Sequence, residues 1–98
     1  MLVRIIKSYR DVVAICDSDL LGKKFEENEF QLDIKESFFG GDELGDLEAI
    51  ELMNDMAKED ATFNIVGKES IKAALKAGII NKENIGKIAG IPYALILW

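Results

Sequence analysis

Histidine is absent from this sequence, and its absence removes several kinds of chemistry at once. Histidine is the usual general base near neutral pH, the usual partner of a catalytic nucleophile and the commonest transition-metal ligand in proteins. Because Cys16 is the only cysteine, the chain also lacks the ligands of a structural zinc site and cannot form an internal disulfide. We therefore expect no metal, no cofactor and no catalytic residues, and we favour a binding function over an enzymatic one.

Long hydrophobic runs are absent as well. The longest, IPYALILW at residues 91–98, is far shorter than the roughly 20 residues of a membrane-spanning helix. The first ten residues carry Arg4, Lys7 and Arg10 and lack the apolar run of a secretory signal peptide. A single cysteine also fits a reducing compartment. These features predict a cytoplasmic protein without membrane association.

Basic residues are outnumbered by acidic ones, and the charge is unevenly distributed. The chain has 18 acidic and 12 basic residues, and 13 of the acids lie within residues 26–60, where only Lys35 and Lys58 are basic. An acidic surface repels the phosphates of a nucleic acid and suits either solubility or contact with a basic surface. We therefore expect a protein partner rather than a nucleic acid. The oligomeric state stays open.

The chain is long enough for one hydrophobic core. Its 98 residues, 49% of them hydrophobic, suit a single domain over residues 1–98. The segments 2–9 and 11–16 are rich in Val and Ile and predict an N-terminal antiparallel hairpin. Cys16 ends the second segment, so we expect it to be buried and unreactive, with a pKa that the neighbouring Asp17 raises further.

Residues 18–34 predict short elements joined by polar segments. Residues 18–21 predict one helical turn that Gly22 closes, and the residues EENE at 26–29 predict a polar connection. The segment 30–34 alternates apolar and polar residues, which predicts a strand with one buried face. The inward residues of that strand would be Phe30, Leu32 and Ile34.

The C-terminal half predicts two main helices and three strands. Apolar residues at helical spacing predict helices over 46–60 and 67–78, the second ending at Gly78. Residues 62–66 predict an apolar strand, and residues 84–90 and 91–98 predict the last two.

Strand, helix and strand follow one another over residues 62–88, which predicts a right-handed βαβ unit with parallel strands. Together the segments predict an α/β domain of α+β character. Its mixed sheet would have about five to six strands, with the N-terminal antiparallel hairpin, two main helices and one βαβ unit.

The stretch ESFFGGDE at residues 36–43 is the first candidate binding site. Neighbouring residues of a strand face opposite sides, so we expect one of the two phenylalanines to be buried and the other exposed. The glycine pair would end the strand, with φ > 0 in at least one residue, and would let a ligand approach the backbone. The candidate residues are Glu36, Ser37, Phe38, Phe39, Gly40 and Gly41. The alternative is a strand end with a structural role only.

The start of the second helix is the other candidate. NIVGKES places Asn64 in a strand, then Gly67 and Lys68 where the helix begins. Free amides at a helix N-terminus attract anions, and a lysine adds to this attraction. Glu69 opposes an anion, however, and the phosphate-loop pattern G-x-x-x-x-G-K-[ST] is absent. The alternative is a glycine that only caps the helix.

Several motifs together resemble a small archaeal family. CDSDLLGKKF, ESFFGG, NIVGKES and IPYALI occur in an order and spacing similar to the domain of unknown function 424. The resemblance covers essentially the whole chain. It implies an archaeal, cytosolic, single-domain protein without an established activity. Members of that family often carry tyrosine where this chain has Phe39 and histidine where it has Tyr93, so a catalytic histidine at the latter position could not operate here.

The leading hypothesis is a small binding or adaptor domain that acts through protein contact. One alternative is an enzyme that uses the carboxylates Asp33, Glu36 and Asp42 beside the glycine pair, and a deep carboxylate-lined pocket would indicate it. A second alternative is an RNA-associated protein, which a continuous basic stripe would indicate. The basic residues of that stripe would be Arg4, Lys7, Arg10, Lys68, Lys72 and Lys76.

Overall fold

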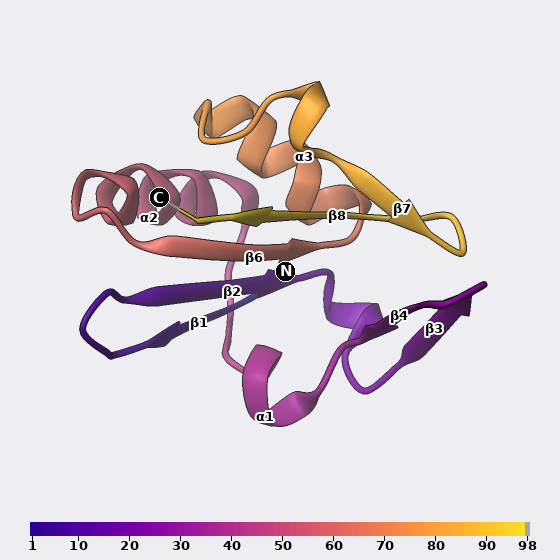
Figure 1. Cartoon of the computed structure of the whole chain (residues 1–98). Coiled ribbons are helices and arrows are strands. Elements are labelled where there is room, and N and C mark those ends of the chain that lie inside the picture. Colours follow the sequence, from indigo (N-terminus) through magenta and orange to yellow (C-terminus); the bar gives the residue numbers. More distant parts are fainter. Residues whose placement is uncertain (98) are drawn as a thin grey trace.

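Six strands form one mixed sheet, and a separate two-stranded hairpin lies beside it (Figure 1). The computed structural model describes residues 1–97. The strands of the sheet, in the spatial order β5-β1-β2-β6-β8-β7, are β1 (Leu2–Ile6), β2 (Val12–Cys16), β5 (Asp42–Glu43), β6 (Thr62–Val66), β7 (Gly86–Ile88) and β8 (Ile91–Ile96). The separate hairpin consists of β3 (Lys24–Glu27) and β4 (Phe30–Asp33).

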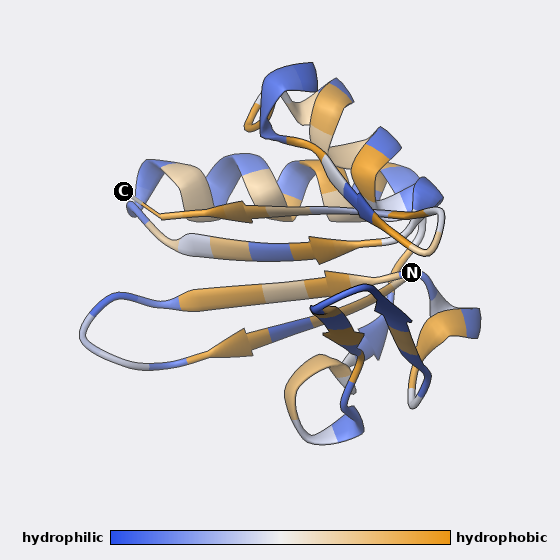
Figure 2. Cartoon of the chain, turned by 45° about the vertical axis from the view of Figure 1, so that its right-hand side comes forward, coloured by the Kyte–Doolittle hydropathy of each residue, from blue (hydrophilic) through white to orange (hydrophobic). Residues whose placement is uncertain are grey.

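Two helices cover one face of the sheet (Figure 1). These are α2 (Asp46–Lys58) and α3 (Lys68–Ala77), and the 3-10 turn η2 (Lys82–Asn84) follows α3. Along both helices hydrophobic residues alternate with hydrophilic ones, as expected for helices with one buried face (Figure 2). The side chains buried between the helices and the sheet include Val3, Val13, Ile15, Ala49, Met53, Phe63, Ile65, Ile71 and Ala74.

The opposite face of the sheet is covered only in part. The single helical turn α1 (Glu36–Phe39), the 3-10 turn η1 (Ser18–Leu20) and the β3–β4 hairpin pack there, around the C-terminal ends of β2 and β6. This second cluster buries Ala14, Cys16, Leu20, Ile34, Phe39 and Val66. The sheet therefore separates a large core under the helices from a smaller one under α1.

Most predicted elements are confirmed. The N-terminal hairpin pairs Leu2 with Cys16 through to Ile6 with Val12, and both main helices begin and end within two residues of the predicted positions. Gly78 ends α3 with φ +76°, the left-handed conformation that a glycine adopts without strain. The predicted fold class is confirmed as well, a mixed six-stranded sheet with helices of α+β character.

The two parallel strands that pair directly are β2 and β6. They are not the two strands of the βαβ unit predicted over residues 62–88. α2 lies in the connection between β2 and β6. β6 and β7 are not neighbours, because β8 lies between them and is antiparallel to both. A two-residue turn joins β7 to β8, and its residues Ala89 and Gly90 both have φ > 0, as in a tight β-hairpin. This turn leads the chain back between β6 and β7, where β8 lies.

The prediction of a polar connection at residues 26–29 is wrong, because this stretch includes the end of β3 and the turn into β4. The prediction that Phe30 points inward is also wrong, since its side chain is 64% exposed. The β3–β4 hairpin stands beside the sheet, and only Phe25 and Leu32 of its apolar residues reach the second cluster.

The prediction that ESFFGG ends a strand is wrong, because these residues form α1 and the turn after it. Gly40 has φ −71°, and neither it nor Gly41 belongs to the residues with positive φ, so the predicted left-handed glycine is absent. The need for glycine is steric instead. A Cβ on Gly41 would lie 2.1 Å from the carbonyl oxygen of Val3, so only glycine lets this backbone lie against β1.

Candidate functional site

The first half of the segment 36–43 carries two aromatic rings on α1. The rings of Phe38 and Phe39 meet edge to face, with centroids 5.0 Å apart and planes at 79°. Phe39 is 6% exposed and packs into the cluster under β2 and β6, which confirms the prediction of one buried phenylalanine. The predicted exposure of the other ring is wrong, because Phe38 packs against Phe39 and is half-buried.

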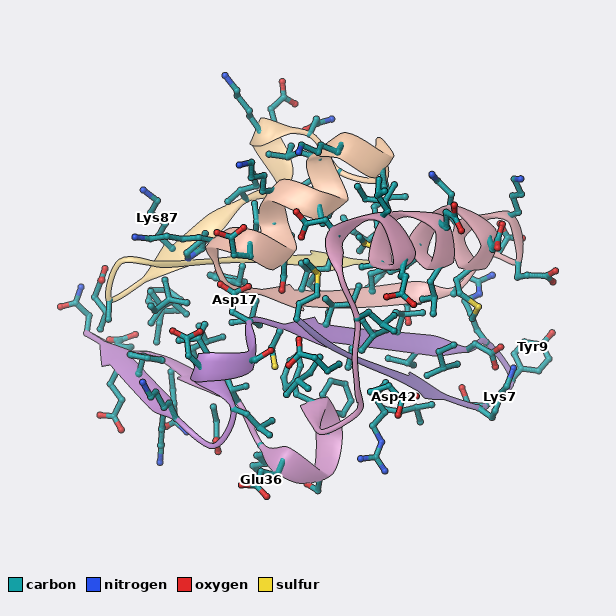
Figure 3. All side chains as sticks on the ribbon, turned by 180° about the vertical axis from the view of Figure 1, so that it is seen from behind. Lys7, Tyr9, Asp17, Glu36, Asp42 and Lys87 are labelled. Atoms are coloured by element: carbon teal, nitrogen blue, oxygen red, sulfur yellow. The ribbon has the colours of Figure 1, made fainter. Side chains whose placement is uncertain are left out.

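The polar residues of the segment lie on its outer side. Glu36 and Ser37 are exposed, and Figure 3 shows Glu36 at the far end of α1, pointing away from the domain. Gly40 fastens the end of the turn to β1, since its carbonyl oxygen accepts a hydrogen bond from Arg4 Nη1 at 2.9 Å. The phenylalanines, rather than the acids, therefore face the body of the protein.

A cleft of about 340 Å³ opens between α1, β4 and the sheet, and we call it the α1 cleft. Its walls are formed by Gln31, Leu32, Asp33, Phe38, Phe39, Asn64, Ile65, Val66, Tyr93, Ala94 and Leu95. The structure thus brings Asn64 together with the two phenylalanines, although no pattern in the sequence joins them. The side-chain amide of Asn64 makes no hydrogen bond with another side chain in the described chain, so it is available to donate and accept.

Beyond the α1 cleft, no described element covers this face of the sheet. Residues paired across neighbouring strands share a face, so Asn64 lies in a row with Arg4, Ala14 and Leu95. Leu95 is 52% exposed, and Leu97, just after β8, is 68% exposed. We call this surface the open face. It consists of Ile6, Val12, Thr62, Asn64, Leu95 and Leu97.

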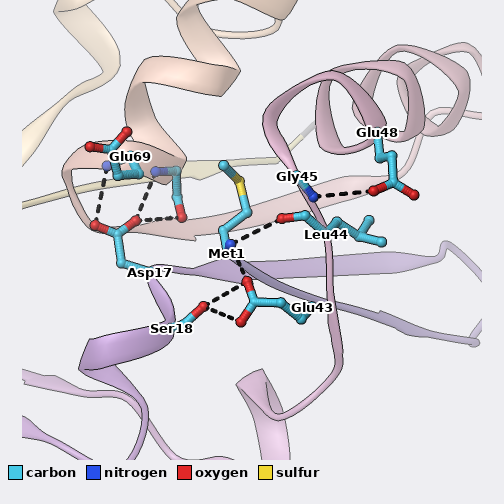
Figure 4. Close-up of polar contacts among 9 residues, drawn as sticks. Met1, Asp17, Ser18, Glu43, Leu44, Gly45, Glu48 and Glu69 are labelled. Atoms are coloured by element: carbon cyan, nitrogen blue, oxygen red, sulfur yellow. Dashed lines mark hydrogen bonds and ion pairs between the residues drawn. The ribbon is translucent and has the colours of Figure 1, made fainter.

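The second predicted site, where α3 begins, is filled by a carboxylate of the chain itself (Figure 4). Asp17 Oδ2 accepts a hydrogen bond from the amide of Glu69 at 3.1 Å, and Asp17 Oδ1 accepts one from the amide of Ser70 at 2.8 Å. Lys68 is exposed, and Gly67 has φ +108° and lies directly against the Asp17 carboxylate. An external anion at these amides would have to displace Asp17.

From the sequence, Asp17 is considered only as a charge beside Cys16, and its contact with α3 is missed. Gly67 does occupy the cap position of α3, as predicted, but glycine has no side chain that could accept a hydrogen bond from the helix. The first amides of α3 therefore take their acceptor from elsewhere in the chain or from water. Nothing in the local sequence identifies Asp17 as that acceptor.

A second carboxylate joins β5 to η1 (Figure 4). Glu43 accepts hydrogen bonds from the amino group of Met1 at 2.5 Å and from Ser18 Oγ at 2.6 and 2.8 Å. The hydrogen bond from the amino group, followed by that from Ser18, lowers the pKa of Glu43. These contacts hold β5 against the start of β1.

Cys16 is buried, as predicted, and lies under α1. Burial, and after it the neighbouring charge of Asp17, raises the pKa of the thiol from its ordinary value of 9.0 to about 11. A thiol in this state is protonated at neutral pH and is a poor nucleophile.

The carboxylates of the enzyme hypothesis do not converge. Asp33 lines the α1 cleft, Asp42 lies on the outer side of β1, and Glu36 points into solvent (Figure 3). Within residues 1–97 no group of three or more Asp, Glu or Cys side chains is placed to hold a metal ion. No helix in the same part of the chain is long and apolar enough to span a membrane.

The basic residues of the RNA hypothesis are divided between two sides of the sheet. Arg4 shares a face with Ala14, on the side of α1, whereas Lys68, Lys72 and Lys76 belong to α3 on the other side. Lys7 lies at the far end of the β1–β2 hairpin (Figure 3), where its ammonium group pairs with Asp11 at 3.1 Å.

Comparisons with known proteins agree with the resemblance in the sequence. The family model described as a protein of unknown function, DUF424, matches residues 6–98. A crystal structure of an uncharacterized conserved protein from Methanopyrus kandleri is similar in fold, with a TM-score of 0.87 and 25% sequence identity over 97% of this chain and 88% of that one. Comparison with curated proteins gives no match. The resemblance is therefore confirmed, and it brings no activity with it.

Proposed function

We propose, for a chain that belongs to the DUF424 family of proteins of unknown function, a binding function exercised through contact with another protein. The proposal places this domain in the cytoplasm of an archaeal cell. An archaeal structural neighbour and a single, buried, unpaired cysteine support that location.

The observation that carries the proposal is the open face with the α1 cleft at its border. An isolated exposed leucine needs no explanation, but Leu95 lines the same cleft as the half-buried Phe38 and Tyr93. Leu97, two residues further along the chain, is exposed as well. An anchoring side chain of a partner would fill this cleft, and such anchors dominate the energy of many interfaces. Asn64 would supply the polar contact that orients the anchor.

Binding fits this arrangement better than catalysis. Asp33 is the one carboxylate among the residues that line the α1 cleft, so the three carboxylates of the enzyme hypothesis have no common site there. Tyr93 lies across the cleft from α1 and offers a ring and a hydroxyl group, which suit contact with an apolar side chain that has a polar end.

The experiment is affinity capture from extracts of the source cells with three purified baits, namely the wild type, Leu95→Glu and the control Leu47→Glu. Leu47 is an exposed leucine on α2, on the opposite side of the sheet, so the two variants carry the same change on different surfaces. Equal melting temperatures would establish that both variants are folded. We expect a partner that the wild type and Leu47→Glu retain and Leu95→Glu loses.

Two results would overturn the proposal. The first is a partner that Leu95→Glu retains as well as the wild type. The second is a stable dimer of the purified wild type, measured by light scattering, that Leu95→Glu converts to a monomer, because a second copy would then cover the open face.

A further inference from the structure

The outer side of β1 is paired over only part of its length. β5 pairs with Leu2 and Val3, and the preceding chain turns away from β1 at Gly41 toward α1. No strand pairs with Arg4–Ile6 on this side among residues 1–97. At the other edge of the sheet, by contrast, the β3–β4 hairpin contacts β7, and Glu27 accepts a hydrogen bond from the amide of Ala89.

The backbone of Ile5 points toward this unpaired edge. Met1 and Leu44 exchange hydrogen bonds in both directions, at 2.8 and 3.1 Å. In an antiparallel ladder every second residue makes such a pair with the same neighbouring strand, so Val3 and Ile5 are the next residues that face outward. The N–H and C=O of Ile5 are thus presented to an incoming strand, while those of Arg4 and Ile6 bond with β2.

An apolar groove with an acidic rim lies along the same edge, and we call it the edge groove. It consists of two adjoining pockets of about 440 and 450 Å³ that share Ile5, Leu44 and Leu52 as their floor. Ile5 is 37% exposed. The charged residues that line the two pockets are four acids and one base, Asp42, Glu48, Glu51, Asp55 and Arg4.

We propose that an extended, basic segment of another protein adds to the sheet as a strand beside β1 and lies in the edge groove. Main-chain hydrogen bonds to Ile5 would hold the segment, as in other cases of strand addition to a sheet edge. Alternate side chains of the added strand face the groove. A lysine or arginine there suits both the apolar floor and the acidic rim. The aliphatic stem covers Ile5 and Leu52, and the charged end reaches the α2 acids.

The acidic rim argues against two other occupants. Two copies of this chain that paired through β1 would bring their Asp42 side chains and the α2 acids toward each other, and like charges across an interface repel each other. A nucleic acid would place phosphates against the same acids. A basic segment of a different protein is the occupant whose charge complements the groove.

The edge groove is distinct from the open face, and the inference does not depend on the function proposed for that face. The two surfaces share no residue. A domain that holds one partner at the open face and a basic strand at β1 would be an adaptor.

The test is a titration of isotope-labelled wild type with synthetic peptides, followed by amide NMR signals. The binding probe is a short peptide that alternates lysine and valine. One control peptide replaces each lysine with glutamate, and another carries N-methyl groups on alternate amides, which removes the donors that a strand needs. We expect the lysine peptide alone to bind, with the largest shifts at Ile5, Ile6 and Lys7 and on the outer side of α2.

Protein variants distinguish binding in the edge groove from attraction by the negative charge of the protein as a whole. Glu51→Lys/Asp55→Lys reverses two rim charges, and the matched control Glu26→Lys/Glu29→Lys reverses two exposed charges on the β3–β4 hairpin. We expect the first variant to lose affinity about tenfold or more and the control to stay within about twofold of the wild type.

Any of three results would overturn the inference. They are absence of binding by the lysine peptide, equal binding of the N-methylated peptide, and equal loss of affinity in the two charge variants. None of these bears on the partner of the open face, so the two proposals fail or succeed separately.

Discussion

Asp17 and Ser70 are joined by two hydrogen bonds, because Asp17 Oδ1 accepts from both the amide nitrogen and the hydroxyl group of Ser70 at 2.8 Å. Ser70 is the one polar residue among the fully buried side chains of residues 1–97. The pair connects the end of β2, beside Cys16, to the first turn of α3. It therefore couples the small cluster under α1 to the helix layer on the other face of the sheet.

Replacing Asp17 with alanine should lower the free energy of unfolding by roughly 2–3 kcal/mol. The change removes the cap of α3 and leaves the buried hydroxyl of Ser70 without its acceptor. Urea unfolding of the variant and of the control Asp19→Ala, an exposed acid in η1, measures the effect. The free energy of unfolding of the control should lie within about 0.5 kcal/mol of the wild-type value. Equal stability of wild type and Asp17→Ala would show that the cap is dispensable.

Two glycines with positive φ should differ in their tolerance of alanine. Gly78→Ala should lower the free energy of unfolding by about 1 kcal/mol, since a Cβ there meets open space and only the backbone conformation is strained. Gly67→Ala should cost more, roughly 3 kcal/mol, because its Cβ would also lie 2.3 Å from Asp17 Cγ. Chemical denaturation of the two variants provides the comparison. A larger loss in Gly78→Ala would contradict the packing seen at Gly67.

The two phenylalanines of α1 should respond differently to truncation. Phe39→Ala should cost roughly 3–5 kcal/mol, because the ring fills the cluster under β2 and β6. Phe38→Ala should cost about 1–2 kcal/mol, the share expected of a half-buried ring that also loses its edge-to-face contact. Thermal unfolding of both variants tests this order. Equal, large losses would mean that Phe38 belongs to the core and that the α1 cleft is not a free surface.

Cys16 should resist thiol reagents in the native protein and react fully after unfolding. The thiol ionises near pH 9 in the unfolded chain and near 11 in the folded one. Its contribution to the free energy of unfolding is therefore complete below pH 9 and is lost as the pH rises from 9 to 11. Urea titrations over this range should show a steeper loss of stability for wild type than for Cys16→Ala. Parallel curves, or rapid labelling of the native protein at pH 7.5, would contradict the buried state of the thiol.

The parts of the fold that the sequence predicted are those specified by local patterns. Helical spacing identified α2 and α3, and runs rich in Val and Ile identified β1 and β2, because each pattern reflects one buried face. Phe30 belongs to a segment with the alternation of a half-buried strand, yet its side chain is exposed. The alternation does not show that the β3–β4 hairpin stands apart from the sheet. The sequence predicts a positive φ in the glycine pair of ESFFGG. The structure requires glycine at position 41 for another reason, because the backbone there lies too close to Val3 for a side chain.

The candidate site was predictable only in fragments. Asn64 and Phe38 were each identified by the chemistry of their own segments, but the α1 cleft exists because β6 and α1 meet in space. The role of Asp17 depends on a contact with Ser70 that no local signal announces. The unpaired edge at Ile5 follows from the early departure of the chain at Gly41, and no pattern in the sequence indicates the order of the strands.

Photo-crosslinking inside the source cells detects contact between the open face and another protein. A photoreactive phenylalanine analogue would replace Leu95 in one strain and Leu47 in another. We expect a discrete crosslinked product to a different protein from position 95 and none from position 47. Equal crosslinking at the two positions, or a product from position 47 alone, would rule out specific protein contact through the open face.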